Sequence, residues 1–277
     1  MKEDKDFLRI EKLKSCYFSK SNSSPLYKIL IMEGNGTIHV DFVEYELEGR
    51  IALFTSPYQH LAINATHPFD VQQLAFHGDF YCIEYHKKEV ACNGLLFNNI
   101  YKQPFIRIKD NELEFFFKQI RLEAEKNEPF SQPILRSYLQ LILAISSKIK
   151  LLDPDIMLED TSSQGLSPFK ELLEKHFLVQ RMPAFYAEQL SLSSNVFTKK
   201  CKKNFGKSPT QLIQERVVLE AKKQLHLTHK NVKEIAADMN FGDEHYFSRY
   251  FKKHTGVSPS VFREKVGISI VADLSII

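Results

Sequence analysis

The chain has 277 residues, of which 43% are hydrophobic and 26% charged. This composition is typical of a soluble globular protein and excludes a disordered chain, and the length suits two domains of ordinary size. The first fourteen residues alternate charges and lack the apolar segment of a signal peptide, and no apolar run approaches the roughly 18–20 residues of a membrane helix. We therefore expect a cytoplasmic protein without a membrane partner.

The formal net charge of +3 conceals an uneven distribution of charge. From Pro168 to Gly267 the chain has 18 Lys and Arg against 10 Asp and Glu, whereas the first 167 residues have 19 against 23. A basic C-terminal block predicts a polyanionic partner for that half of the chain. A solvated basic surface without a partner is the alternative, because charge alone does not identify a ligand.

The N-terminal part favours β-structure. Glu33–Gly36 predicts a hairpin turn, because Asn-Gly accepts positive φ at both central positions, and Glu48-Gly49 predicts a second turn. Ser56-Pro57 is expected to end a strand. Many short strands at this spacing predict a small barrel or sandwich. The expected strands are Tyr27–Met32, Thr37–Val43, Ile51–Thr55, Leu61–Asn64 and Gln72–Phe76.

After Pro104 the apolar period changes from 2 to 3.6 residues. This period predicts helices over Asn111–Glu125 and Pro133–Ile149, of which the second is strongly apolar. Its apolar side serves either as buried core or as a dimer contact, and core is the favoured interpretation. Leu151–Ser167 contains Asp153-Pro154, Thr161-Ser162-Ser163 and Gly165 and predicts an interdomain linker, followed by a helix that Ser167 caps.

A repeat at an offset of fifty residues relates Phe197–Pro209 to Phe247–Pro259. Upstream, Ala187–Leu190 aligns with Ala236–Met239 at an offset of forty-nine, so the second copy has one extra residue in its turn. Each copy predicts a short helix, a turn and a longer helix that ends at a glycine.

Each longer helix is expected to have an apolar face and a polar face. A 3.6-residue wheel places Phe197, Cys201 and Phe205 on one stripe of the first copy, and Phe247 and Phe251 on that of the second. Amide, hydroxyl and cationic side chains of the polar face suit base edges and phosphates in a major groove. For one copy a plain solvated surface is the better interpretation, but two matching copies in a basic domain favour DNA. The polar positions are Asn195, Thr198, Lys199 and Lys202 in the first copy, and His245, Ser248, Arg249 and Lys252 in the second.

The segment between the copies predicts a rigid spacer. Thr210–Leu227 has a continuous helical pattern of eighteen residues, which corresponds to about 27 Å at 1.5 Å per residue. Such a spacer suits two recognition helices in successive major grooves, which lie roughly 34 Å apart on one side of DNA.

Residues Pro168–Lys265 resemble the DNA-binding domain of the AraC/XylS family of transcriptional regulators, and Val232–Ala236, Phe241–Lys253 and Gly256–Pro259 carry the resemblance. The resemblance implies two helix-turn-helix units joined by a long helix. It also implies base-reading and phosphate-binding roles for specific side chains. The base-reading residues would be Asn195, Thr198, Lys199, His245, Ser248 and Arg249, and the phosphate-binding residues Ser193, Lys202, Lys203, Lys252 and Lys253.

Gly49–His60 resembles a strand and a proline-containing turn of the cupin-like barrel found at the N-terminus of this family. The resemblance implies a sensor or dimerisation domain, with a small-molecule effector of unknown identity, a homodimer and RNA polymerase as partners beside double-stranded DNA. The expected fold is α+β. Its expected parts are a β-rich domain over 1–105, connecting or dimerisation helices over 106–150, a linker over 151–167, a double helix-turn-helix domain over 168–267 and a tail over 268–277.

Two alternatives concern chemistry. A cupin-type metal-dependent enzyme fused to a DNA-binding module requires clustered ligands, but the N-terminal histidines (His39, His60, His67, His77 and His86) include no H-x-H pair. We therefore expect no catalytic residue, metal or cofactor, and His60 is interpreted as a turn residue. The four cysteines include no C-x-x-C. Cys201 lies among lysines, which would favour a reactive thiol, but its place on the apolar stripe favours burial.

Overall fold

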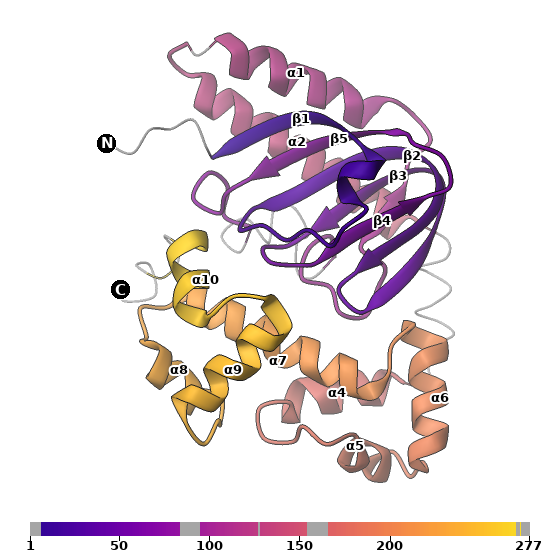
Figure 1. Ribbon diagram of the computed structural model, residues 1–277, viewed down its shortest axis with the longest axis vertical. Coiled ribbons are helices and arrows are strands. Elements are labelled where there is room, and N and C mark those ends of the chain that lie inside the picture. Colours follow the sequence, from indigo (N-terminus) through magenta and orange to yellow (C-terminus); the bar gives the residue numbers. More distant parts are fainter. Residues whose placement is uncertain (1–6, 84–94, 127, 154–165, 270–271, 273–277) are drawn as a thin grey trace. The chain divides into compact units, whose positions relative to one another are not determined.

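The computed structural model describes residues 7–83, 95–126, 128–153, 166–269 and 272. It has an α+β fold, with an antiparallel sheet in the N-terminal half and helices in the C-terminal half (Figure 1). The described residues group into two compact units. The first contains Met1–Asn99 and Gln103–Leu152, and the second contains Asp153–Ile268 together with Ile100–Lys102.

Six strands of the first unit form one antiparallel sheet. The strands follow the order β1-β5-β2-β3-β6, and β4 pairs with the far end of β2. The expected strands at Leu61–Asn64 and Gln72–Phe76 are confirmed as β4 and β5, whereas β1 and β6 were not predicted. The bounds are β1 Leu8–Lys14, β2 Tyr27–Val40, β3 Val43–Thr55, β4 Leu61–Ala65, β5 Asp70–Phe76 and β6 Phe105–Arg107, with a 3₁₀ helix, η2, at Ser15–Phe18.

The predicted turn at Glu33–Gly36 is wrong, because β2 runs through it without interruption. Glycine suits positions 34 and 36 because other chain segments approach the backbone closely there. A Cβ atom on Gly34 would lie 2.3 Å from the Phe69 ring, and one on Gly36 would lie 2.2 Å from the backbone oxygen of Asn64. The turn predicted at Glu48-Gly49 is also wrong, since Gly49 lies inside β3 and pairs there with Gly34 of β2.

The hairpin turn between β2 and β3 instead lies at Asp41-Phe42, next to the Val40–Val43 pair. Asp41 has a φ of 52°, which aspartate tolerates better than most residues because its side chain bonds locally. Its carboxylate accepts hydrogen bonds from Gln59 Nε2 and from the backbone N–H of His60, both at 2.9 Å. These bonds hold the hairpin turn against the segment that leads into β4.

Alternating side chains give the sheet two apolar faces. One face packs under helices α1 (Glu112–Lys126) and α2 (Ser131–Leu151), where Phe54 and Phe76 share a core with Leu139. The other face has a second core that includes Leu30 and Ile63. The two predicted helices are confirmed to within two residues at each end, and the apolar side of α2 is used as buried core, as favoured above.

The second unit is helical over its described residues. Residues 154–165 of the predicted linker lie outside the described residues. Leu151 is the last residue of α2 and Ser167 is the first residue of α4, so each described end of the predicted linker overlaps a helix by one residue. The cap predicted at Ser167 is wrong, because the N-cap residue is Leu166, which makes no side-chain cap. The helices are α4 Ser167–His176, α5 Pro183–Gln189, α6 Ser194–Phe205, α7 Pro209–Leu227, α8 Val232–Asp238, α9 Glu244–Thr255 and α10 Pro259–Val266. None of the helices in the described parts of the chain is long and apolar enough to cross a membrane.

Candidate nucleic-acid interface

Two helix-turn-helix units lie in the C-terminal unit, formed by α5 with α6 and by α8 with α9 (Figure 1). The turn has four residues in the first unit and five in the second, which confirms the extra residue expected from the repeat. Ser191 and Asn240 adopt left-handed backbone at matching places, with φ of 53° and 56°. Gly206 and Gly256 end the longer helices in the same conformation. The predicted repeat is thus confirmed in backbone geometry.

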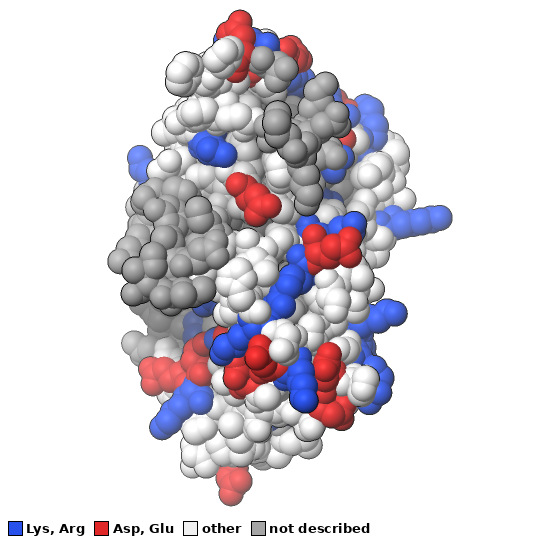
Figure 2. All heavy atoms as spheres, turned by 90° about the vertical axis from the view of Figure 1, so that its left-hand side faces the viewer, with Lys and Arg blue, Asp and Glu red and all other residues white. Residues whose placement is uncertain are grey.

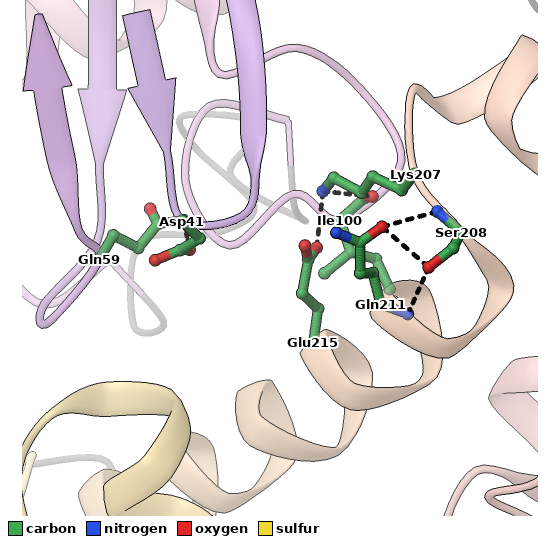
Figure 3. A network of polar contacts seen from close by, with 7 residues as sticks. All are labelled: Asp41, Gln59, Ile100, Lys207, Ser208, Gln211 and Glu215. Carbon is green, nitrogen blue, oxygen red and sulfur yellow. Dashed lines mark hydrogen bonds and ion pairs between the residues drawn. The ribbon is translucent and has the colours of Figure 1, made fainter.

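Side-chain caps fix where the helices begin. Capping boxes are present at Ser208 with Gln211 and at Asn231 with Glu234. In Figure 3 the Gln211 side chain accepts hydrogen bonds from the backbone N–H and hydroxyl of Ser208, both at 2.8 Å. The recognition helices differ in their caps, since Ser193 caps α6 whereas Asp243 caps α9. Each cap contributes about 1 kcal/mol to stability.

The apolar stripes of α6 and α9 are buried as predicted. Phe197, Cys201, Phe247 and Phe251 are all 0–1% exposed. Burial raises the pKa of the Cys201 thiol to about 12, because the thiolate loses its hydration. The neighbouring lysines do not offset this loss, since their side chains lie on the exposed side of the helix. The reactive-thiol alternative is therefore wrong, and the structural interpretation of Cys201 is confirmed.

The six predicted base-reading residues lie on the opposite side of these stripes, with the same exposure in both copies. Asn195 and Lys199 are exposed, as are His245 and Arg249 at the equivalent positions. None of these four forms a hydrogen bond or an ion pair with a residue that the structure describes. Thr198 and Ser248 are half-buried at equivalent positions. Thr198 Oγ1 donates to the backbone oxygen of Ser194 at 2.8 Å, so this hydroxyl retains only acceptor capacity.

The predicted phosphate-binding lysines lie in the last turns of α6 and α9. Lys202, Lys203, Lys252 and Lys253 are exposed and have no ion-pair partner among the described residues. Cations at these positions also complement the helix dipole, so they have a structural use as well. Ser193 differs from them, because its hydroxyl oxygen accepts a hydrogen bond from the backbone of α6 at 3.4 Å.

Other basic residues of the C-terminal unit are engaged internally. Lys207 is 6% exposed, and its ammonium group donates to the backbone oxygen of Ile100 at 3.0 Å and pairs with Glu215 at 2.6 Å (Figure 3). Arg216 donates to the Glu174 carboxylate at 2.9 Å. Figure 2 shows one face of the protein, on which basic and acidic side chains are interspersed. The exposed cations of α6 and α9 therefore define the candidate interface more specifically than net charge does.

Sequence reasoning missed two exposed apolar side chains on the recognition helices. Val196 and Tyr246 occupy equivalent positions of the repeat and are 43% and 49% exposed. Their place beside the base-reading residues suits contact with thymine methyl groups or deoxyriboses. The sequence repeat could have indicated these two positions. Each of them adjoins a buried phenylalanine and precedes the cation of its helix, Lys199 or Arg249, by three residues.

Three N-terminal histidines, His39, His60 and His77, make local contacts. His60 Nδ1 lies 3.2 Å from Ser21 Oγ, which supports the interpretation of His60 as a turn residue. His39 lies 3.1 Å from a carboxylate oxygen of Glu44. His86 lies outside the described residues. Within the described ranges, no three His, Cys, Asp or Glu side chains are grouped closely enough to hold a metal ion.

Comparison with known proteins identifies the C-terminal region. Residues 186–265 match a family model described as a helix-turn-helix domain. The chain is 32% identical over 79 residues to the raffinose operon transcriptional regulatory protein RafR of Pediococcus pentosaceus, and the match covers 28% of each chain. It is 30% identical over 92 residues to the transcriptional activator RhaS of Salmonella schwarzengrund, and this match covers 33% of each chain. The matched part thus spans a third or less of these curated relatives.

Among solved structures, the C-terminal domain of the two-component response regulator yesN of Fusobacterium nucleatum is 29% identical. The match covers 34% of this chain and 92% of that domain, with a TM-score of 0.32. The sequence relatives and the repeat geometry agree. The C-terminal unit contains a helix-turn-helix domain of the AraC/XylS type, and the resemblance stated for Pro168–Lys265 is confirmed over residues 186–265.

Proposed function

We propose that this chain is a sequence-specific, double-stranded-DNA-binding transcriptional regulator of the AraC/XylS type that acts in the cytoplasm. One observation carries the proposal. From the cap to the glycine, α6 and α9 bury equivalent positions, and the centre of each exposed face has a cation, Lys199 or Arg249, that pairs with no residue the structure describes. Packing explains a repeated buried stripe, but it does not explain a repeated polar face. The proposal includes no catalytic step.

In the proposed complex, α6 and α9 enter successive major grooves. Helix α7 has 19 residues and is therefore about 28 Å long, which suits recognition helices roughly 34 Å apart. Base contacts come from Asn195, Thr198, Lys199, His245, Ser248 and Arg249. Phosphate contacts come from Ser193, Lys202, Lys203, Lys252 and Lys253. The second copy has Asp243 where the first has Ser193, so we expect a phosphate contact at this position only in the first copy.

The test is a selection of bound duplexes from random DNA with the full chain. We expect an enriched sequence with two separated blocks, because two recognition helices read two groove segments. The Arg249→Ala variant should lose preference in one block and keep it in the other. Enrichment of no sequence, or of one block that Arg249→Ala leaves unchanged, would contradict the proposal.

For the first unit we propose a cupin-like barrel that serves as a sensor or dimerisation domain. The second apolar core supports this proposal, because it joins residues of β2, β3, β4, β5 and β6 on one face of a single sheet, as expected for a sheet that curves round an interior. A small-molecule effector of unknown identity and RNA polymerase are the other proposed partners. Measuring DNA affinity with and without a panel of metabolites tests the effector.

Dimerisation is proposed through α1 and α2, with a second copy of this chain as the partner. Ile134 and Leu141 are exposed on α2, and Tyr138 and Ile145 continue the same line at spacings of four, three and four residues. This spacing is typical of helix–helix contacts between chains. Light scattering should report a dimer that Leu141→Lys converts to a monomer, whereas Gln132→Lys, exposed on the same helix, should leave it intact. A wild-type monomer at micromolar concentration would contradict this part.

A further inference from the structure

Arg181, in the segment that leads into the first helix-turn-helix unit, contacts the second unit by a route other than α7. It lies between α4 and α5, before the first unit, and its guanidinium group reaches the turn of the second unit. Its Nη2 atom donates to the backbone oxygen of Met239 and lies 3.4 Å from that of Asn240. Its Cζ atom lies 3.8 Å from the centroid of the Phe241 ring, within the range of a cation–π contact.

The turn held by Arg181 is packed directly against the second recognition helix. The Phe241 ring contacts three aromatic rings of α9, at centroid distances of 5.7 Å to Tyr246, 5.1 Å to Phe247 and 5.3 Å to Tyr250. Both Phe247 and Met239 are fully buried. A displacement of the guanidinium group relative to Phe241 is therefore transmitted to α9 through close-packed rings.

The first unit has no equivalent contact among the described residues. Leu192 stands at the position of Phe241 and has no aromatic face to receive a guanidinium group. The contact is thus not a general feature of the repeat. Together with α7 it closes a ring from α4 through α7 to α8 and α9. Helices of both units already pack on α7, and the Arg181 contact adds a second restraint between the segment before α5 and the turn of the second unit.

We propose that Arg181 is a positioning residue that fixes the distance and angle between α6 and α9, and thereby the number of base pairs that the protein prefers between its two half-sites. The inference rests on the proposed function. Arg181 touches no base in this proposal. It restricts the recognition helices to one relative placement, so that DNA with the wrong spacing between half-sites binds weakly.

The test uses the full chain and a library of duplexes in which the two selected half-sites are separated by spacers of different length. Arg181→Lys keeps the charge but loses the planar stack and the forked donors. Phe241→Leu removes the stack from the other side and keeps the turn apolar. Arg216→Lys is the matched control, because its Cζ atom lies 3.9 Å from the centroid of Phe177 and its partners lie on α4 and α7, away from the second turn.

The wild type and Arg216→Lys should each enrich one spacer length. Arg181→Lys and Phe241→Leu should enrich at least three lengths and bind the preferred length about five- to thirtyfold more weakly, while both half-site sequences stay unchanged. A single spacer length with both of these variants, or equal broadening with Arg216→Lys, would overturn the inference. Enrichment of no half-site by the wild type would contradict the proposed function itself.

Discussion

The two helix-turn-helix copies have the same architecture and different surfaces. The buried positions of α6 and α9 match one for one, and both helices end at a left-handed glycine. Their exposed faces differ, since the first has four lysines, whereas the second has Arg249, two lysines and the aromatic Tyr246, with the half-buried Tyr250 at the position of Lys200. Arginine presents a planar fork that reads guanine through two hydrogen bonds, whereas lysine acts as a flexible point charge.

This difference teaches that packing and recognition impose separate requirements on one helix. Burial fixes which positions of each copy face the core, although the residue itself differs, since Cys201 stands where the second copy has Phe251. The exposed face is free to specialise. We therefore expect the second copy to provide more of the sequence discrimination and the first to provide more of the electrostatic attraction.

The largest expected effect concerns the buried phenylalanine that both copies share. Phe197→Ala and Phe247→Ala each remove a fully buried ring and should lower the free energy of unfolding by about 3–5 kcal/mol. Hydrogen exchange of the amides of α6 and α9 measures the loss. Val261→Ala, at a site 38% exposed on α10, is the control and should cost less than about 1 kcal/mol. A large loss in one copy alone would show that the two units do not have equivalent cores.

The next effect concerns the exposed faces, in which the two copies differ. Arg249→Ala should weaken binding to the selected duplex by about 1–3 kcal/mol, roughly five- to 150-fold, because a forked base contact is lost. Lys199→Ala should cost less on the same duplex. Fluorescence anisotropy with the selected and a scrambled duplex measures both. Equal losses for Arg249→Ala on the two duplexes would contradict a base-reading role.

The phosphate-binding lysines should have a smaller and sequence-independent effect. Lys202→Ala and Lys252→Ala should each weaken binding to every duplex alike and lower the salt dependence of the affinity by about one unit on a double-logarithmic plot. Titrations between low and high salt measure the slope. Lys118→Ala, on α1 of the first unit, is the control and should leave the slope unchanged. An unchanged slope with both test variants would remove these lysines from the interface.

The smallest effect concerns Cys201, on the buried side of α6. Because burial raises the pKa of its thiol to about 12, almost none of it is thiolate at pH 8. Mass spectrometry after alkylation of the native protein should find Cys16, which is exposed, modified and Cys201 unmodified. Unfolding in urea should make both react. Rapid labelling of native Cys201 would show that α6 does not pack as described.

Local signals in the sequence predicted the C-terminal unit well. The helix ends are specified by nearby residues, such as Ser208 with Gln211 and the glycine at 206, so the repeat and its caps were visible without a structure. The roles of the base-reading residues remain predictions, because exposure alone does not identify what a side chain contacts.

Contacts with distant residues explain the wrong turn prediction and the failure to single out Arg181. Gly34 and Gly36 predicted a turn, but they are required by Phe69 and Asn64, which lie about thirty residues further along the chain. Arg181 was not singled out, since its partner Phe241 is sixty residues away and belongs to the other helix-turn-helix unit. Tertiary contacts of this kind leave no periodic pattern in the sequence.

The central claim is that both recognition helices read bases in one complex. Missing-nucleoside interference on the selected duplex tests it most directly, because it locates every base whose removal weakens binding. We expect two clusters of interference about one helical turn apart, with Arg249→Ala abolishing one cluster alone. A single cluster, or interference that is uniform along the duplex, would contradict it.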